Sequence, residues 1–132
     1  MTAVNFRALP ESSRPNRWLV CPPGYASREP DETPPVFDTD CAGLRAAWRA
    51  LIQREPRIEV LRDEADGMDL VQRTALLRFA DDIAVAYVNL GHGRSTIALF
   101  SRSRVGYSDL GVNRRRLGRW LAALREKLTV LS

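Results

Sequence analysis

The residues best suited to chemistry lie in one polar, basic and glycine-punctuated run, residues 101–116. Arg102 and Arg104 stand two positions apart, so both are expected to project from one face of a strand. Gly106 and Gly111 permit backbone conformations that other residues resist. Guanidinium groups beside a helix N-terminus form a typical oxyanion site. The sequence therefore predicts an anion site whose candidate ligand-binding residues are Arg73, Arg78, Arg102, Arg104, Tyr107, Ser108 and Asn113.

A structural role is the competing interpretation of the same run. Asp109 is placed to cap the helix that follows. On a helical wheel Asn113 falls within the apolar stripe and points inward, where an unsatisfied polar side chain costs about 1–3 kcal/mol. Both residues would then tie the turn to neighbouring backbone, while Tyr107 would pack with its hydroxyl group hydrogen-bonded. Both interpretations, site and scaffolding, are compatible with the sequence.

Residues for metal binding or acid–base catalysis are few. His92 is the only histidine and stands in a glycine-flanked hairpin turn, so a site with two histidine ligands is excluded. Cys21 and Cys41 match no zinc or redox spacing. We therefore expect no metal, no cofactor and no catalytic residues. The alternative is an enzyme of unknown reaction that uses Tyr107, Ser108 or Asp109.

The charge of the chain is unevenly distributed. Of its 20 basic residues only Lys127 is a lysine. From Gly93 onward nine basic residues face two acidic ones, whereas the first 92 residues hold eleven basic and fourteen acidic residues. Clustered positive charge concentrates anions near a surface, which favours an anionic partner. A weak nucleic-acid binder is a further alternative, although residues 114–116 spread their arginines around the helix.

Composition indicates one globular domain in the cytoplasm. The chain has 132 residues, 45% hydrophobic and 27% charged, which is average globular usage and excludes wholesale disorder. No apolar run approaches the roughly 18 residues of a membrane span, and residues 1–10 lack the apolar block of a signal peptide. We therefore expect both cysteines to be reduced.

Hydrophobic periodicity and turn residues predict a two-layer α+β domain. Leu44, Trp48, Leu51 and Ile52 recur at helical spacing, so an amphipathic helix is expected to end before Pro56. Short turns join four consecutive strands, which therefore pair antiparallel, and the two helices must bury their stripes on a sheet face. The expected order is a short strand at 36–37, a helix at 40–54, strands at 57–62, 68–79, 83–90 and 94–105, and a helix at 111–128.

The first third of the chain differs from the rest. Seven of the eight prolines stand within residues 1–35, and proline is excluded from helix interiors and central strands. We expect an irregular arm at 1–35, with residues 17–21 as its apolar anchor, packed on a single α+β domain at 36–132.

Both faces of the expected sheet are apolar. Ile83 and Val85 alternate with Ala84 and Ala86, so neither face of this strand is clearly solvated. The helices can cover only one of the two faces. The other is expected to be covered by the arm, by a second subunit in a homodimer, or by a ligand.

Three segments resemble the bacterial domain-of-unknown-function family 1499. Residues 103–114, Ser-Arg-Val-Gly-Tyr-Ser-Asp-Leu-Gly-Val-Asn-Arg, look like the signature of that family. Residues 73–82 resemble its Arg-rich strand ending in Phe-x-Asp-Asp, and Pro15-Asn16 resembles its N-terminal Pro-Asn, here without the Cys that usually follows. The resemblance spans about residues 15–125 and implies a small α+β domain with no established activity.

The function that these features favour is a non-enzymatic binding or interaction module. Its arginine-lined site would take a small anionic molecule, a lipid headgroup or an acidic protein. Specific nucleic-acid binding and a transmembrane segment are not expected.

Overall fold

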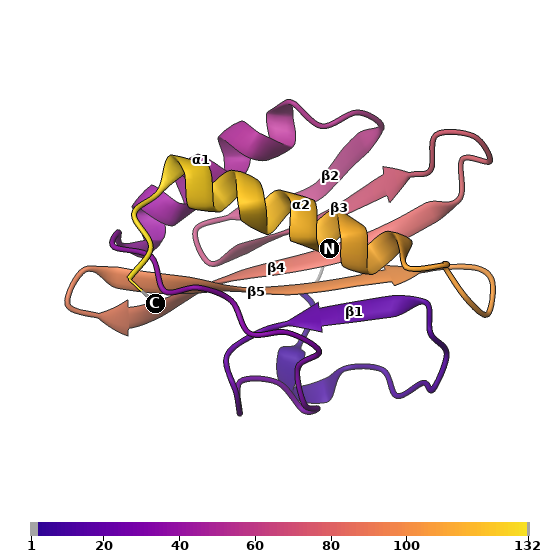
Figure 1. The fold of residues 1–132 in the computed structure, drawn as a ribbon, viewed down its shortest axis with the longest axis horizontal. Helices are drawn as coiled ribbons and strands as arrows, with labels where there is room; N and C mark the ends of the chain where they lie inside the picture. The colour runs from indigo at the N-terminus through magenta and orange to yellow at the C-terminus, as the bar shows by residue number, and fades with distance from the viewer. Residues whose placement is uncertain (1–2, 132) are drawn as a thin grey trace.

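The structure is a computed structural model that describes residues 3–131. Figure 1 shows a single antiparallel sheet with strand order β1-β5-β4-β3-β2. Two helices and this five-stranded sheet confirm the predicted α+β class. The elements are η1 (Phe6–Ala8), β1 (Arg17–Val20), α1 (Cys41–Gln53), β2 (Ile58–Glu64), β3 (Gly67–Arg73), β4 (Ala80–Gly91), β5 (Arg94–Ser103) and α2 (Val112–Lys127).

The first strand differs from the expected one. Phe37 makes only isolated bridges, to Ser95 and Val130, and the strand that precedes α1 is β1. Prolines flank β1 on both sides, but they lie outside its four residues, and β1 is an edge strand whose outer side meets only an isolated bridge between Val20 and Glu32. The segment predicted as an apolar anchor therefore belongs to the sheet. The domain boundary at residue 35 stays a prediction.

The expected strand at 68–79 also ends early, because β3 stops at Arg73. Thr74 closes a loop over residues 74–79: its backbone N–H donates to the Phe79 carbonyl, and its hydroxyl accepts from the Phe79 N–H at 2.9 Å. Arg78 takes a φ of 59° in this loop, a left-handed conformation that a strand does not contain.

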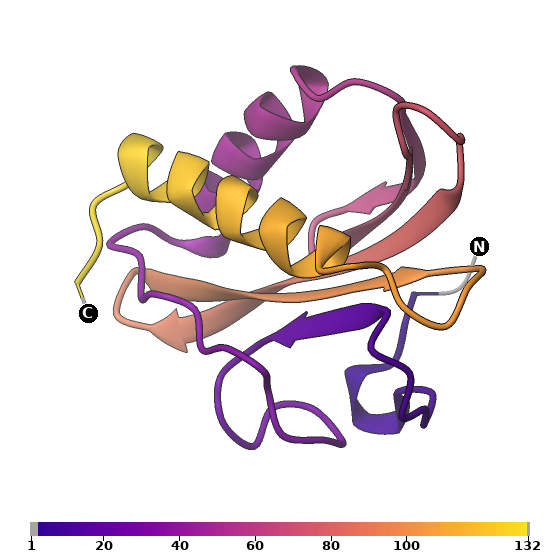
Figure 2. The same cartoon turned by 45° about the vertical axis from the view of Figure 1, so that its right-hand side comes forward.

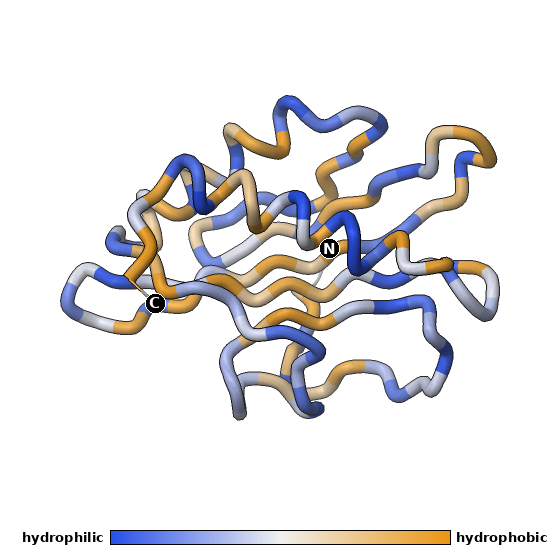
Figure 3. The backbone as a smooth tube through the Cα atoms, in the orientation of Figure 1, coloured by the Kyte–Doolittle hydropathy of each residue, from blue (hydrophilic) through white to orange (hydrophobic). Residues whose placement is uncertain are grey.

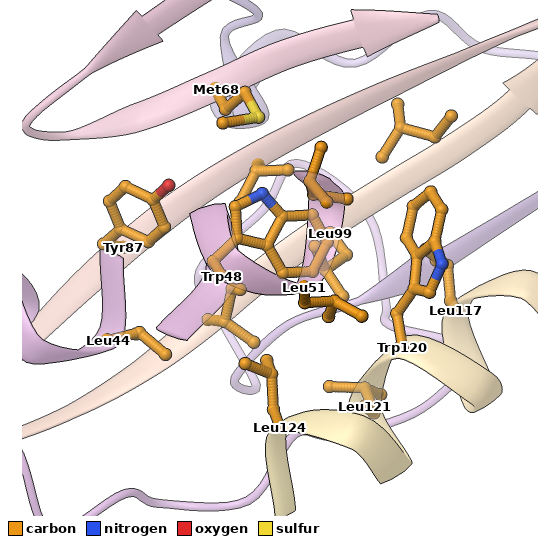
Figure 4. Close-up of a cluster of buried hydrophobic side chains, with 14 of the residues drawn as sticks. Leu44, Trp48, Leu51, Met68, Tyr87, Leu99, Leu117, Trp120, Leu121 and Leu124 are labelled. Carbon is orange, nitrogen blue, oxygen red and sulfur yellow. The ribbon is translucent and has the colours of Figure 1, made fainter. Parts of the chain in front are cut away.

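Both helices pack on the same face of the sheet, as Figure 2 shows. The Asp40 carboxylate accepts a hydrogen bond from the Gly43 N–H and caps α1. Trp48 of α1 meets Trp120 of α2 edge to face, with ring centroids 5.6 Å apart (Figure 4). Strand residues Ile83, Val85, Ile97 and Leu99 complete this main core.

The opposite face of the sheet is covered by the N-terminal segment. Phe6 and Leu9 are 7% and 6% exposed and pack on a cluster of apolar strand side chains. The Ser27 N–H donates to the Phe6 carbonyl at 2.8 Å, and the Ser27 hydroxyl accepts from the Leu9 N–H. The arm, a second subunit and a ligand were the three expected ways of covering this face, and the N-terminal segment of the arm occupies part of it. The strand residues in the cluster are Leu19, Ala84, Ala98 and Phe100.

Candidate anion-binding site

The sheet register places Arg102 beside two other charged residues. On β5, Arg102 lies opposite Asp82 of β4 on one side and opposite Arg17 of β1 on the other. All three residues stand on the sheet face that the helices leave free, because the intervening positions Asp81 and Ser101 carry side chains that contact α2. The antiparallel pairing of β1, β5 and β4 therefore builds a row of charges near one end of the sheet.

Two adjoining cavities share Arg102, Arg104 and Asp82 in their walls. The first, about 260 Å³, runs between the N-terminal segment and the sheet, over the apolar side chains of Ala84 and Phe100. The second, about 270 Å³, adds one arginine from the segment before β1 and one from the start of β1. Together they form an apolar space with a basic end. The arginines around the second cavity are Arg14, Arg17, Arg102 and Arg104.

Asp82 is the only acidic residue lining this basic end within residues 3–131, and Arg104 occupies it. The guanidinium group of Arg104 donates to both carboxylate oxygens, with Nε–Oδ2 and Nη2–Oδ1 distances of 2.9 and 2.8 Å. These hydrogen bonds raise the pKa of Arg104. Arg102 has no ion pair in the described part of the chain. Its positive charge is therefore left for another partner.

The guanidinium group of Arg17 lies close to other positively charged side chains. Burial lowers the pKa of Arg17 and the positive charges of Arg28 and Arg102 lower it further, while the Asp31 carboxylate offsets part of this effect. Its guanidinium group donates to the Pro10 carbonyl at 3.0 Å, which positions the group without neutralising it. A bound anion would relieve this repulsion.

The opposite end of the apolar cavity is acidic. Asp69 of β3 is 6% exposed, and one of its oxygens accepts from Arg62 Nε at 2.9 Å. Its other oxygen, Oδ1, is buried and has no hydrogen-bond partner within residues 3–131. Arg62 also pairs with Glu64 and Asp66, so three carboxylates share one guanidinium group. The cavity thus has opposite polarity at its two ends.

The structure separates Arg73 and Arg78 from this site. Arg73 ends β3 and lines a different cavity, beside the start of α2. Its Nη1 donates to the Arg78 carbonyl at 3.3 Å, while the Arg78 side chain is exposed on the loop. The predicted set of seven residues is therefore distributed over more than one location, and only Arg102 and Arg104 share a cavity.

Tyr107 and Ser108 lie on the exposed loop between β5 and α2. Tyr107 is 67% exposed and therefore does not pack as the structural interpretation expected. The Ser108 hydroxyl accepts from the Leu110 N–H at 3.2 Å within the loop. The N-cap residue of α2 is Gly111, not Asp109 as expected, but the Asp109 carboxylate accepts from the Gly111 and Asn113 N–H groups at 2.8 and 3.0 Å and so still holds the start of the helix.

Asn113 points inward, as its place on the helical wheel predicted, and its amide is fully engaged. Nδ2 donates to the Asn16 carbonyl, the Ser103 hydroxyl and the Asp109 carboxylate. Oδ1 accepts from the Ser101 hydroxyl and from Arg116. These contacts give Asn113 a structural role, because its donors and acceptor are all used inside the protein.

Sequence reasoning missed Arg116, the centre of a buried polar network. Arg116 is 4% exposed and donates to Gln72 Oε1 and to Asp81 Oδ2, at 2.6 Å in both cases. The spacing of the sequence could have indicated its burial, because Arg116 follows Asn113 by three positions and directly precedes Leu117 of the apolar stripe. The network joins α2 to strands β3, β4 and β5.

The described residues offer no metal site and no membrane-spanning helix. No group of three or more His, Cys, Asp or Glu side chains among residues 3–131 is placed to hold a metal ion. No helix in the same range is long and apolar enough to cross a membrane. Cys21 and Cys41 are free thiols, and burial raises the pKa of both.

Fold and site together define a two-layer α+β domain with an arginine-lined cavity on the face opposite its helices. Residues 12–124 match the family described as Protein of unknown function (DUF1499), so the chain belongs to this family. The resemblance found in the sequence is thereby confirmed. Comparisons with curated proteins and with solved structures found no match.

Proposed function

We propose that the chain is a non-enzymatic binding module for a small molecule that carries an anionic group on an apolar body. The observation that carries this proposal is the position of Arg102. Its side chain lines both adjoining cavities, lacks a carboxylate partner in the described residues, and stands at the basic end of an apolar space. An anionic headgroup at Arg102 would leave the apolar body over Ala84 and Phe100.

The chemistry of arginine suits this task. A guanidinium group offers five N–H donors in a planar fork that matches the oxygens of a carboxylate or phosphate. Charge-assisted hydrogen bonds of this kind are about twice as strong as neutral ones. Arg14 and Arg17 add positive charge around the same anion, while Asp82 is committed to Arg104.

The unpaired oxygen of Asp69 supports a second requirement on the ligand. An acceptor that is buried without a partner costs about 1–3 kcal/mol, so a ligand N–H or O–H group at Oδ1 would be favourable. Asp69 and Arg102 are two strands and two residues apart in the sheet, which corresponds to about 12 Å between their Cα atoms. The ligand that fits best is therefore a small dipolar molecule with an apolar middle.

Three simple probes test the proposal: 6-aminohexanoate, hexanoate and hexylamine, titrated by NMR at constant ionic strength. We expect 6-aminohexanoate to bind more tightly than hexanoate, and hexylamine to bind least. Arg102→Gln is expected to weaken binding of 6-aminohexanoate by about tenfold or more, the loss of a charge-assisted hydrogen bond. Asp69→Asn should remove the preference for 6-aminohexanoate over hexanoate.

Arg94→Gln is the matched control, because Arg94 is an exposed arginine on the same strand at its opposite end. It should bind the probes as the wild type does. Circular dichroism would establish that all three variants fold. Binding of 6-aminohexanoate that Arg102→Gln leaves unchanged, or that no backbone resonance near Arg102 reports, would refute the proposal.

The competing functions have less support from the contacts in the structure. For an enzyme, Tyr107 and Ser108 lie exposed on a loop, and the Asp109 carboxylate is engaged by two backbone N–H groups. For a homodimer through the second sheet face, Phe6 and Leu9 already occupy part of that face. A cytoplasmic location remains part of the proposal, supported by the free thiols of Cys21 and Cys41.

A further inference from the structure

More than half of the exposed large apolar side chains stand on two loops at one end of the sheet. Ten such residues are exposed among residues 3–131, and six of them stand on two loops, at 74–79 and 104–111. Leu76 and Leu110 are 88% and 84% exposed, so they contact almost nothing within the protein. The six residues are Leu76, Leu77, Phe79, Val105, Tyr107 and Leu110.

The two loops lie at the same end of the sheet, and we call them together the loop end. The first connects β3 to β4 and the second connects β5 to α2, at the same end of the sheet in Figures 1 and 2. The Arg104 N–H, at the start of the second loop, donates to the Ala80 carbonyl, directly after the first, at 3.1 Å. In Figure 3 the loop between β3 and β4 carries a hydrophobic tip.

Between the start of the first loop and the first two turns of α2 lies a cavity of about 260 Å³ lined by arginine side chains. It is bounded by Thr74 on one side and by Val112, the first residue of α2, on the other. Five arginines and no acidic residue of the described chain line it. The five are Arg57, Arg73, Arg115, Arg116 and Arg119.

Three of these arginines are held in place without being neutralised. Arg57 Nε donates to the Arg73 carbonyl at 2.9 Å, and Arg115 Nη1 donates to the Leu110 carbonyl at the same distance. Arg73 donates to the Arg78 carbonyl. A backbone carbonyl fixes a guanidinium group but leaves its full charge and most of its five donors available. Within residues 3–131 none of the three has an ion pair, whereas Arg116 and Arg119 have Asp81 and Glu55.

From this combination we infer that the loop end docks on the surface of an anionic lipid membrane. Leu76, Leu77 and Leu110 enter the interfacial region, while Arg57, Arg73 and Arg115 hold lipid phosphate groups. Stable attachment to a membrane surface generally needs an apolar contribution and an electrostatic one, and the loop end supplies both. Four of the six exposed side chains are aliphatic, Leu76 and Leu110 being the most exposed, and aliphatic side chains suit lipid better than nucleic acid because they cannot stack on bases as aromatic ones do.

Vesicle co-sedimentation tests this docking directly. The full chain is expected to bind vesicles that contain phosphatidylserine, to bind pure phosphatidylcholine vesicles far more weakly, and to lose affinity as salt is added. Joint replacement Leu76→Ser and Leu110→Ser should weaken binding more than tenfold, since each leucine loses its apolar burial in the interface. We expect the affinity for these vesicles to fall about fivefold with each of the single substitutions Arg57→Gln, Arg73→Gln and Arg115→Gln.

Matched controls come from the other end of the sheet. Leu90 is 44% exposed on β4 and Arg94 is exposed on β5, so Leu90→Ser and Arg94→Gln should bind vesicles as the wild type does. Absence of vesicle binding would overturn the inference. So would vesicle binding that survives the leucine pair, or single-stranded DNA binding tighter than vesicle binding. A titration with inorganic phosphate completes the test: phosphate that binds at Arg73 while vesicles do not would assign the cavity to a free anion instead.

Discussion

Arg116 of α2 and Asp81 of β4 form an ion pair inside the protein, with 2.6 Å between Nη2 and Oδ2 and side chains that are 5% and 2% exposed. Two charges buried in this way lose their hydration, and their mutual attraction together with further hydrogen bonds must offset that loss. Gln72, Ser101 and Asn113 supply those further bonds to Arg116. The pair therefore fixes the position of α2 on the sheet, and with it the start of the helix beside the loop end.

Removing one partner of the buried ion pair should lower the free energy of unfolding far more than removing one partner of an exposed ion pair. Arg116→Ala leaves the Asp81 carboxylate buried and unpaired, so the free energy of unfolding should fall by about 3–5 kcal/mol. Arg104→Ala is the matched substitution, because the Arg104–Asp82 pair is 47% and 36% exposed and should contribute less than about 1 kcal/mol. Urea denaturation of both variants measures the difference. Equal losses of free energy in the two variants would contradict the expected difference between the buried and the exposed pair.

Alkaline pH should destabilise the protein, in part through Tyr87. Tyr87 is 7% exposed, its hydroxyl has no partner in the described residues, and burial raises its pKa above the ordinary value near 10. Because the fold retains the protonated phenol, stability is intact below about pH 9 and falls as the unfolded chain ionises at higher pH. Tyr87→Phe should flatten this fall and change stability at pH 7 by less than about 1 kcal/mol. Thermal unfolding between pH 7 and 11 measures both, and a variant with the full wild-type slope would contradict the assignment.

Two glycines should respond to alanine in opposite directions. Gly67 begins β3, and a Cβ atom there would stand 2.1 Å from the Val85 carbonyl oxygen, so the two strands would have to separate. Gly67→Ala should therefore lower the free energy of unfolding by about 1–3 kcal/mol. Gly118 is exposed within α2 and has open space around it, so Gly118→Ala should raise stability by about 0.5–1 kcal/mol. Scanning calorimetry measures the melting temperatures of the two variants. If both melting temperatures move in the same direction, this explanation is excluded.

The fold could be predicted well where the pattern is local. The apolar spacing of Leu44, Trp48 and Leu51 marks α1, and turn residues separate the four consecutive strands, so these elements are found near their expected positions. β1 was not expected as a strand, because four residues between prolines carry no periodic signal. Its pairing with β5 depends on residues distant in sequence.

The candidate site was predicted in part for a similar reason. Arg102 stands near the end of β5 and Arg104 in the loop directly after it, where the expected strand to residue 105 has already ended, and both line the same cavity. Arg73 belongs to another cavity because β3 ends there and the chain turns away towards Thr74. Arg116 looked like one more exposed charge, since its acceptors Gln72 and Asp81 reach it only through the folding of the sheet. Local pattern locates charges, but long-range pairing decides which of them are neutralised.

The position of β1 has a consequence for how the chain is made. β1 is synthesised early, yet the strand with which it pairs, β5, ends at Ser103. During translation the apolar residues Leu19 and Val20 must wait for most of the chain to leave the ribosome before they can be covered. Contacts between such distant segments form slowly, and until they form the apolar side chains stay exposed to solvent. The prolines on both sides of β1 cannot extend a ladder, so they also protect the nascent chain from pairing with its neighbours.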